Sequence, residues 1–250
     1  MVASPAFKAD TGAANIANRA TGKVEHQMNQ AEKIGNLHDL VRDRVQRSMD
    51  VKKMLLLDRT FCELVANAAM QIVRSLRAGG KVFFMGNGGS AADAQHLAAE
   101  FTGRYLKERR ALPALALSAN SSSLTAIGND YGFDLVFARQ VEALGREGDV
   151  AVGISTSGNS RNVIRALEVA KSKSIYTVSL TGASGGLMKS IADCAICMPT
   201  DETPRIQESH ILTGHIICEI AELALIEDPG DKAEKDNAVV ASAHRVKGIK

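Results

Sequence analysis

The chain has 250 residues, of which 45% are hydrophobic and 23% charged, and its formal net charge is +2. This length allows a full buried core, and so small an excess of mixed charges gives no case for a nucleic-acid-binding face. The sequence has no run of about 18 consecutive apolar residues and no apolar stretch near its N-terminus, so we expect neither a membrane span nor a secretion signal.

Residues 1–35 are rich in Ala, Asn, Lys and Gln with little apolar periodicity, which predicts a mobile tail. Two amphipathic helices are expected next, over about 36–57 and 60–78. In the second, apolar residues recur at helical spacing. Gly79 and Gly80 should end this helix, because glycine accepts the left-handed conformation that often follows a helix.

From residue 81 onward, short apolar runs alternate with helical stretches. The runs are KVFFMG, PALALS, DVAVGIS, IYTVSL and DCAICMP. We expect a helix after the first run, a loop and then a helix around 135–144 after the second, a helix over 162–171, a short helix after the fourth run, and a long helix over about 205–227. Unbroken apolar runs suit strands that are covered on both faces, and the alternation predicts an α/β fold with a doubly wound, five-stranded parallel sheet. This domain would span 36–228, followed by a polar tail over 229–250.

The four cysteines, Cys62, Cys194, Cys197 and Cys218, lie in apolar segments. Cys194 and Cys197 form a C-x-x-C pair, a spacing that can bind zinc or carry redox chemistry. Their setting reads as a buried strand, and the chain has no second pair of this kind. We therefore predict core thiols and a reduced, cytoplasmic compartment.

A glycine-rich loop follows the first apolar run, with Gly86, Asn87, Gly88, Gly89 and Ser90. Its backbone N–H groups and the start of the next helix can hold an oxyanion. The spacing formally matches a dinucleotide fingerprint, but the second run ends in Ser-Ala-Asn, without the carboxylate that binds ribose. The loop has no Walker lysine either. A tight turn without any ligand remains an alternative.

A hydroxyl-rich loop follows the third apolar run and contains Ser155, Thr156, Ser157 and Ser160. Capping a helix uses one hydroxyl, and four exceed that need. Because the loop lacks Lys and Arg, neutral donors and the helix start would have to hold the charge of an anion. Two such loops in one sheet predict a small phosphorylated ligand.

Two groups of polar residues lie on helical stretches. His96 and Glu100 are four residues apart and share a helix face, while Gln207, His210 and His215 interrupt the long apolar helix. Buried, hydrogen-bonded histidines would explain the second group without any metal. His and Glu are also ordinary zinc ligands, whereas Gln is an unusual one.

Spacing limits how the second group can act. Gln207 and His215 are eight residues apart, about 12 Å along a helix. Either one of them does not touch the metal, or the two serve different copies of the site in an oligomer. His210 falls on another part of the helix circumference, so we expect it to be structural or interfacial.

Together these motifs resemble the sugar isomerase (SIS) family, and within it the phosphoheptose isomerases, over about 36–227. The segments that carry the resemblance are GNGGSAADAQHLAAEFTGRY, GND, VEALGREGDV, GISTSGNS and RIQESHILTGH. The resemblance implies a flavodoxin-like SIS fold and a homotetramer with sites between subunits. In such a site Gln207 and His215 could come from different subunits, so both could reach one metal. It also implies conversion of sedoheptulose 7-phosphate to D-glycero-D-manno-heptose 7-phosphate through an enediol, as a step in heptose biosynthesis.

The resemblance also implies the site residues. One zinc per subunit would be held by His96, Glu100, Gln207 and His215, with Glu100 as the base and His215 as the acid. The substrate contacts would be Asn87, Gly88, Gly89, Ser90, Glu100, Arg104, Asn129, Asp130, Ser155, Thr156, Ser157, Ser160 and Gln207. Some family members have Asp three residues before the Gln, whereas this chain has Pro204, so help from that carboxylate is missing.

Three alternatives stay open from the sequence. SIS proteins include non-catalytic relatives that associate with the replication initiator, phosphosugar-sensing regulatory domains, and isomerases of other sugar phosphates. The first two need anion-binding loops but no acid–base pair. The joint presence of His96, Glu100, Gln207 and His215 favours an enzyme.

Overall fold

The computed structural model describes residues 36–226, and the tails predicted at 1–35 and 229–250 lie outside the described residues. The domain predicted over 36–228 therefore stays a prediction. The chain divides into two units after Met49. In the first, residues 36–49 provide the start of helix α2 (Leu37–Leu57), as expected. Leu37, Val41 and Val45 are spaced by four and are 64%, 63% and 55% exposed, so this stretch presents an apolar stripe to solvent.

The second unit, from Asp50 onward, is built on five parallel strands. They are β1 (Val82–Gly86), β2 (Ala114–Ala116), β3 (Val150–Ser155), β4 (Tyr176–Thr181) and β5 (Cys194–Cys197). Their order in the sheet, β2-β1-β3-β4-β5, is that of flavodoxin-like folds and confirms the predicted architecture. Gly86 pairs with Ile154 at the ends of β1 and β3, so the loops that follow these two strands start side by side.

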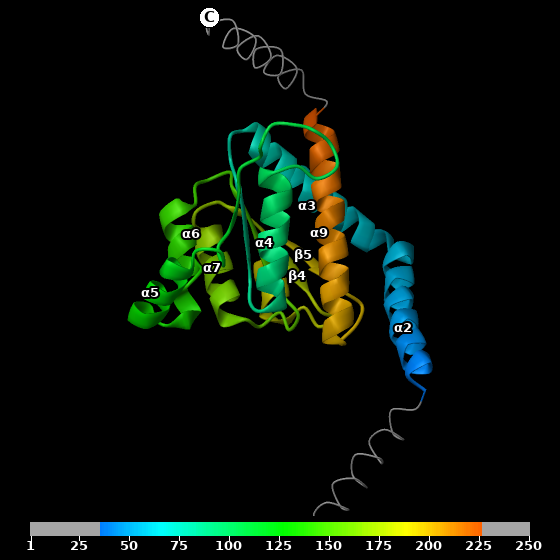
Figure 1. Cartoon of the computed structure of the whole chain (residues 1–250). Helices are drawn as coiled ribbons and strands as arrows, with labels where there is room; N and C mark the ends of the chain where they lie inside the picture. Colours follow the sequence, from blue (N-terminus) through cyan, green and yellow to red (C-terminus); the bar gives the residue numbers. More distant parts are fainter. Residues whose placement is uncertain (1–35, 227–250) are drawn as a thin grey trace, which may run out of the picture. The chain divides into compact units, whose positions relative to one another are not determined.

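Helices cover both faces of the sheet (Figure 1). α3 (Arg59–Arg77), α4 (Gly89–Thr102) and α9 (Thr203–Ile226) pack on one face. α6 (Ala138–Leu144), α7 (Arg161–Ser172) and α8 (Gly186–Ile191) pack on the other. Successive strand residues point to opposite faces, so Phe84 joins the first core and Phe83 the second.

The region between β2 and α6 differs from expectation. A loop was predicted there, but the chain forms helix α5 (Ser121–Tyr131) and a short 3-10 turn, η1 (Phe133–Leu135). α5 has no fully buried residue, and its contact with the core is limited to the partly buried Leu124 and Ile127, so its apolar pattern in the sequence is short. Its start is fixed by Asn120, whose side chain accepts a hydrogen bond from the backbone N–H of Ser123 at 3.0 Å.

By length and composition alone helix α9 could cross a membrane, a test that the buried core helix of a globular domain also passes. Half of that apolar stretch is buried inside the fold, where it shares a core with α3 and β5. The apolar composition of α9 is therefore that of a core helix.

The cysteines are all free thiols, and their burial differs. Cys194 and Cys218 are buried as predicted, whereas Cys62, which was expected in the core, is exposed on α3. Burial raises the pKa of Cys194 to about 11 and that of Cys218 to about 12. Neither thiol is therefore a ready nucleophile at neutral pH.

Candidate active site

The glycine-rich loop and the hydroxyl-rich loop meet at the carboxyl ends of β1 and β3. The chain turns to opposite sides of the sheet after these two strands, which makes this the switch point where α/β proteins bind ligands. The amides of Asn87 and Asn162 join the loops through two reciprocal hydrogen bonds of 2.9 and 2.8 Å. Asn162 is only 3% exposed, so this bridge fixes one loop against the other.

Both helices that start at these loops lack a side-chain cap. The N-cap of α4 is Gly88, whose φ of 54° suits glycine, and the N-cap Ser160 of α7 makes no capping bond. By contrast, Asp58 caps α3 through the N–H of Phe61. In α4 and α7 the first two N–H groups are thus left for an anion, which favours a ligand at both loops. The third is already bonded: Ala91 N–H donates to the Gly88 carbonyl at 3.1 Å, and Val163 N–H donates to Oδ1 of Asn162 at 3.0 Å.

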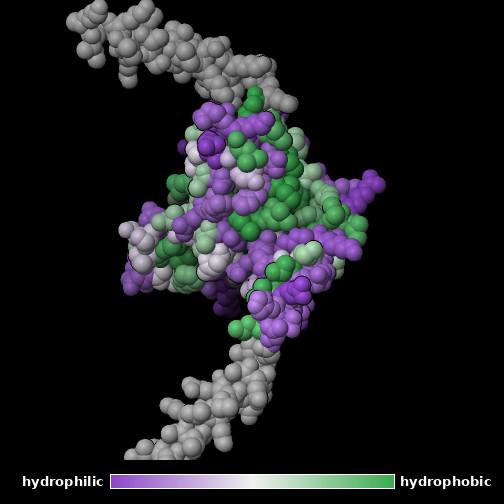
Figure 2. Space-filling view, turned by 45° about the vertical axis from the view of Figure 1, so that its right-hand side comes forward, coloured by the Kyte–Doolittle hydropathy of each residue, from purple (hydrophilic) through white to green (hydrophobic). Residues whose placement is uncertain are grey.

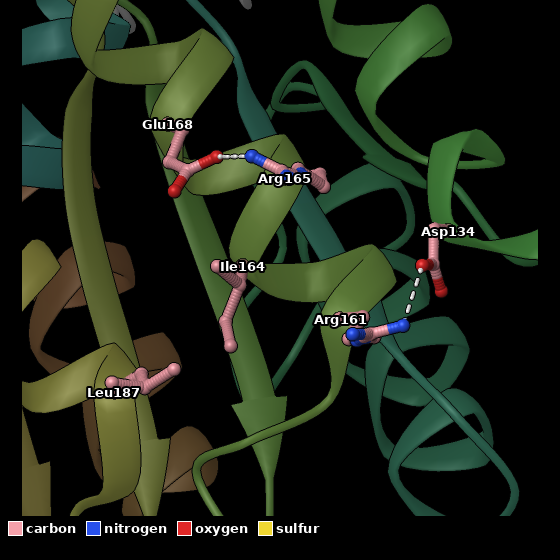
Figure 3. Close-up of a pocket in the computed structure, with 6 residues that line it drawn as sticks. All are labelled: Asp134, Arg161, Ile164, Arg165, Glu168 and Leu187. Atoms are coloured by element: carbon pink, nitrogen blue, oxygen red, sulfur yellow. Dashed lines mark hydrogen bonds and ion pairs between the residues drawn. The ribbon is translucent and has the colours of Figure 1, made fainter.

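The hydroxyl groups of the second loop are turned toward one another. The Oγ atom of Ser155, which is 4% exposed, lies 2.8 Å from that of Ser160 and 3.4 Å from that of Ser157. The neighbouring cation, Arg161, forms an ion pair with Asp134 at 3.6 Å and lines a separate pocket of about 290 Å³ between η1 and α7 (Figure 3). Neutral donors therefore dominate this loop, as the sequence predicts.

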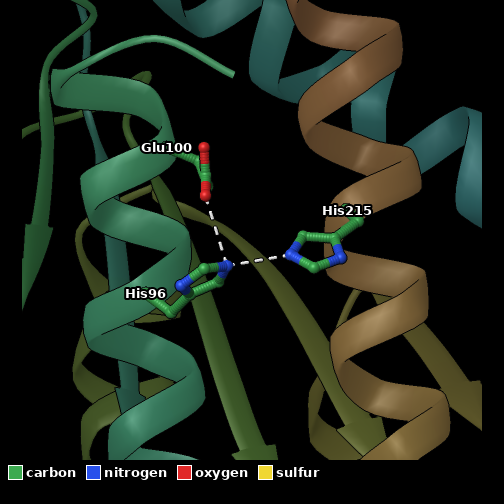
Figure 4. Close-up of side chains that lie close together, drawn as sticks. All are labelled: His96, Glu100 and His215. Atoms are coloured by element: carbon green, nitrogen blue, oxygen red, sulfur yellow. Dashed lines mark hydrogen bonds and ion pairs between the residues drawn. The ribbon is translucent and has the colours of Figure 1, made fainter. Parts of the chain in front are cut away.

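Three potential metal ligands converge from two helices. His96 and Glu100 come from α4 and His215 from α9, and one ligand atom from each lies within 4.8 Å of the other two (Figure 4). The Nε2 atom of His96 is 2.9 Å from Nε2 of His215 and 3.2 Å from Oε1 of Glu100. Two imidazole nitrogens and a carboxylate oxygen thus face a common point.

The chemistry of this donor set fits zinc. His and Glu supply the nitrogen and oxygen ligands that zinc takes in proteins, and a catalytic site has three protein ligands and one open position. Two ring nitrogens facing each other need a proton between them, and a cation can replace that proton. The side chain of His96 is 49% exposed, so a ligand can enter from solvent. His215 is half-buried, less deeply than its apolar neighbours in sequence suggested.

Gln207 lies at the other end of the contact between α4 and α9. A methyl group added to Gly89 would collide with the Gln207 amide nitrogen, so this side chain rests on the glycine-rich loop. This placement brings the first loop and the start of α9 together. Pro204, which replaces the Asp of some family members, lies in the first turn of α9, where proline is well tolerated.

In the part of the chain that the structure describes, no hydrogen bond or ion pair joins the remaining predicted contacts to the metal ligands. Ser90 is buried in the first turn of α4, and Arg104 is exposed just beyond the end of that helix. Asn129 and Asp130 are exposed on the last turn of α5, where the Asn129 amide donates to the Asp130 carboxylate at 2.8 Å. Within residues 36–226 these two make no hydrogen bond to either loop, so their role rests on the resemblance alone.

His210 is structural, as expected. It is fully buried, and its Nε2 atom lies 3.2 Å from the carbonyl oxygen of Thr181. Burial lowers the pKa of His210 to about 4, against an opposing effect of the Thr181 carbonyl. The ring is therefore neutral at physiological pH.

Sequence reasoning missed three polar residues that support the site: Asn162, Arg109 and Glu222. Arg109 and Glu222 form an ion pair at 3.1 Å in which each side chain is 2% exposed. Burial alone would raise the pKa of Glu222, but hydrogen bonds from Leu106, Tyr105 and Lys107 N–H and the charge of Arg109 hold that pKa below its ordinary value. One signal was present: Glu222 interrupts an apolar helix, and a buried carboxylate needs partners.

Comparison with known proteins agrees with this geometry. The SIS domain family matches residues 56–182. The chain therefore belongs to the SIS domain family. A phosphoheptose isomerase of Rhodospirillum rubrum is 59% identical over 161 residues, which cover 64% of this chain and 86% of the relative. One of Aneurinibacillus thermoaerophilus is 49% identical over 192 residues, 77% of this chain and 97% of the relative.

A solved structure agrees as well. The phosphoheptose isomerase of Neisseria gonorrhoeae has a TM-score of 0.70 and 44% identity, covering 75% of this chain and 99% of that one. Within the SIS family, the chain is thus a member of the phosphoheptose isomerases, which are aldose–ketose isomerases.

Proposed function

We propose that the chain converts sedoheptulose 7-phosphate to D-glycero-D-manno-heptose 7-phosphate, with Glu100 as the base and His215 as the acid. The observation that carries this proposal is the convergence of His96, Glu100 and His215, two of which lie on α4, the helix that starts at the glycine-rich loop. Gly89 and His96 are seven residues apart on α4, about 10 Å along the helix. That span is comparable with an extended heptose phosphate, so one end can lie at the loops while the other reaches the cluster.

The reaction moves a proton between two neighbouring carbons. Glu100 takes a proton from the hydroxyl-bearing carbon beside the carbonyl, and His215 gives a proton to the former carbonyl carbon of the enediol. The hydroxyl proton passes from the first oxygen to the second, and exchange with solvent returns Glu100 and His215 to their starting protonation states. Oε1 of Glu100 is the oxygen at His96, which leaves Oε2 for the proton. The hydroxyls of Ser155, Thr156, Ser157 and Ser160, with the N–H groups at the starts of α4 and α7, hold the phosphate.

His96, Glu100 and His215 would hold one zinc ion per subunit, and the family resemblance adds Gln207. When bound, zinc supplies positive charge that polarises the carbonyl and hydroxyl oxygens. A carboxylate on a metal is a weaker base, so Glu100 acts as the base only if its carboxylate shifts away from the metal when substrate binds. The alternative is a mainly structural metal.

We further propose a cytoplasmic homotetramer that serves heptose biosynthesis, with sites between subunits. The apolar stripe of Leu37, Val41 and Val45 supports assembly. So does α9, which exposes Leu212 and Leu223, and Figure 2 shows hydrophobic surface on the side where α9 faces forward. Such exposed apolar surface is typical of protein contacts.

The decisive experiment incubates the purified protein with sedoheptulose 7-phosphate, with and without a chelator, and follows the aldose product. Turnover that the chelator abolishes and added zinc restores supports both the reaction and a catalytic metal. Turnover that resists complete metal removal points to the structural role. Binding of the sugar phosphate without turnover would favour the non-catalytic SIS proteins, and turnover of a different sugar phosphate alone would overturn the substrate.

A further inference from the structure

Glu222 is a buried carboxylate that the proposed reaction does not use. It lies on α9 seven residues after His215, two helical turns along the same face. Its oxygens accept hydrogen bonds from three consecutive backbone N–H groups, those of Tyr105 (3.0 Å), Leu106 (2.8 Å) and Lys107 (2.9 Å). The Nε atom of Arg109 donates a fourth bond at 3.1 Å. Helix α9 thereby fixes the segment that follows α4.

Arg109 extends this network to the end of α4. Its Nη1 atom donates to the carbonyl oxygens of Phe101, Gly103 and Arg110 at 3.0 to 3.2 Å. Its Nη2 atom donates to the carbonyl oxygen of Glu100 at 2.7 Å. The last carbonyls of a helix lack partners within the helix, and a cation there is favourable. Arg109 thus holds the backbone of the residue whose carboxylate reaches the metal cluster.

The same segment contacts the other helix of the cluster. The ring of Tyr105 lies 5.7 Å from the ring of His215, tilted by 33°. His215 also faces His96, with ring centroids 5.1 Å apart. The network therefore contacts both helices of the cluster. Arg109 bonds to the backbone of Glu100 on α4. Tyr105, whose N–H donates to Glu222, contacts the ring of His215 on α9.

We propose that Glu222 and Arg109 are positioning residues that set the geometry of the His96–Glu100–His215 site and so its affinity for zinc. This inference rests on the metal site of the proposed function. A metal site tolerates errors in ligand distance of only about 0.2 Å. Residues that orient ligands typically change metal affinity or activity by about 10- to 100-fold when they are replaced.

Asp149 supplies a matched control, because it is a buried carboxylate with a similar set of bonds elsewhere. It is 1% exposed at the start of β3 and accepts bonds from the backbone N–H groups of Lys81 (2.9 Å) and Arg146 (2.8 Å) and from Lys81 Nζ (2.7 Å). Asp149 immediately precedes β3, at the opposite end of the strands from the two loops. Asp149→Asn should lower stability without disturbing the cluster.

The test measures the zinc dissociation constant by competition with a chromophoric chelator, together with the melting temperature, for wild type, Glu222→Gln, Arg109→Lys and Asp149→Asn. We expect the first two variants to bind zinc about 10- to 100-fold more weakly. The zinc dissociation constant of Asp149→Asn should stay within about twofold of the wild-type value. Its melting temperature should fall about as far as that of Glu222→Gln. Unchanged zinc affinity in Glu222→Gln overturns the proposal, and so does an equal loss of affinity in Asp149→Asn.

The outcomes separate this inference from the proposed function. If the wild-type protein binds zinc but does not isomerise the sugar phosphate, the proposed reaction is wrong. The zinc affinities of the variants then still decide the positioning role. Wild type that isomerises while Glu222→Gln keeps its zinc affinity defeats the positioning role alone. Should Glu222→Gln not fold, Arg109→Lys decides, because lysine keeps the charge but cannot bridge Glu222 and the Glu100 carbonyl together.

Discussion

The Nε2 atoms of His96 and His215 lie 2.9 Å apart, although the two residues are 119 positions apart in the chain. Neither residue alone distinguishes a metal ligand from a core histidine. Together with Glu100, whose Oε1 atom is 3.2 Å from Nε2 of His96, the two histidines form a cluster of potential metal ligands. A purely structural histidine would not need such neighbours.

Glu100→Gln should lower kcat by about 10²- to 10⁴-fold, because the amide cannot take up a proton. The folded structure should persist, since the side chain keeps its size. Steady-state kinetics and thermal melting check both expectations. Glu147→Gln, which alters an exposed carboxylate in the turn before β3, is the control and should be silent. Near-normal turnover in Glu100→Gln would remove Glu100 from the mechanism.

His215→Ala should lose zinc, because only His96 and Glu100 of the three converging groups remain. Elemental analysis after dialysis against a weak chelator should show about one zinc per subunit in wild type and little in the variant. His38→Ala, which changes an exposed histidine on α2, should keep its metal. Full zinc content in His215→Ala would place the metal elsewhere.

Asn162→Ala should raise KM for the sugar phosphate by about tenfold and leave zinc affinity unchanged. The substitution leaves the Asn87 amide without its two bonds, at a cost of about 1–3 kcal/mol, and frees the glycine-rich loop. A double-mutant cycle with Asn87→Ala measures the coupling. Additive effects of the two substitutions would show that the bridge between the loops does not act as a unit.

His210 should make the protein less stable as the pH falls from about 6.5 to about 4. The folded protein holds the ring neutral because its pKa is about 4, whereas the unfolded chain takes up a proton near pH 6.5. Stability from this group is thus complete above pH 6.5 and is lost below it, by at most about 1.4 kcal/mol per pH unit. Denaturant titrations at several pH values give the free energy of unfolding, which should depend less steeply on pH in His210→Asn than in wild type. An equal dependence on pH in the two proteins would contradict the assignment.

The assembled protein should have four times the 26.6 kDa mass of the chain in analytical ultracentrifugation. Val41→Glu combined with Val45→Glu should shift it to smaller species, because both side chains are exposed on the apolar stripe of α2. Replacing Asp43 by Asn on the same helix is the matched control. A monomer in the wild type would refute the assembly.

Much of the fold could be predicted because local patterns report burial. Four of the apolar runs form strands close to their predicted bounds, while PALALS forms only the three residues of β2 at the edge of the sheet. The helix α5 was missed, since it packs only the partly buried Leu124 and Ile127 against the core and two residues make a weak apolar pattern. Cys62 was misplaced for a related reason: an apolar neighbourhood in sequence does not say which way one side chain points.

By itself the sequence determined the α/β pattern, the two loops and the His96–Glu100 pair, because strand and helix periods and a spacing of four residues are local properties of the chain. Only the tertiary structure decided that β1 and β3 are neighbours, that His215 meets His96, that Asn87 meets Asn162, and that Glu222 holds residues 105–107. These contacts join residues 68 (Val82 and Val150) to 119 positions apart. Their existence depends on how the helices and strands pack, which no local spacing records.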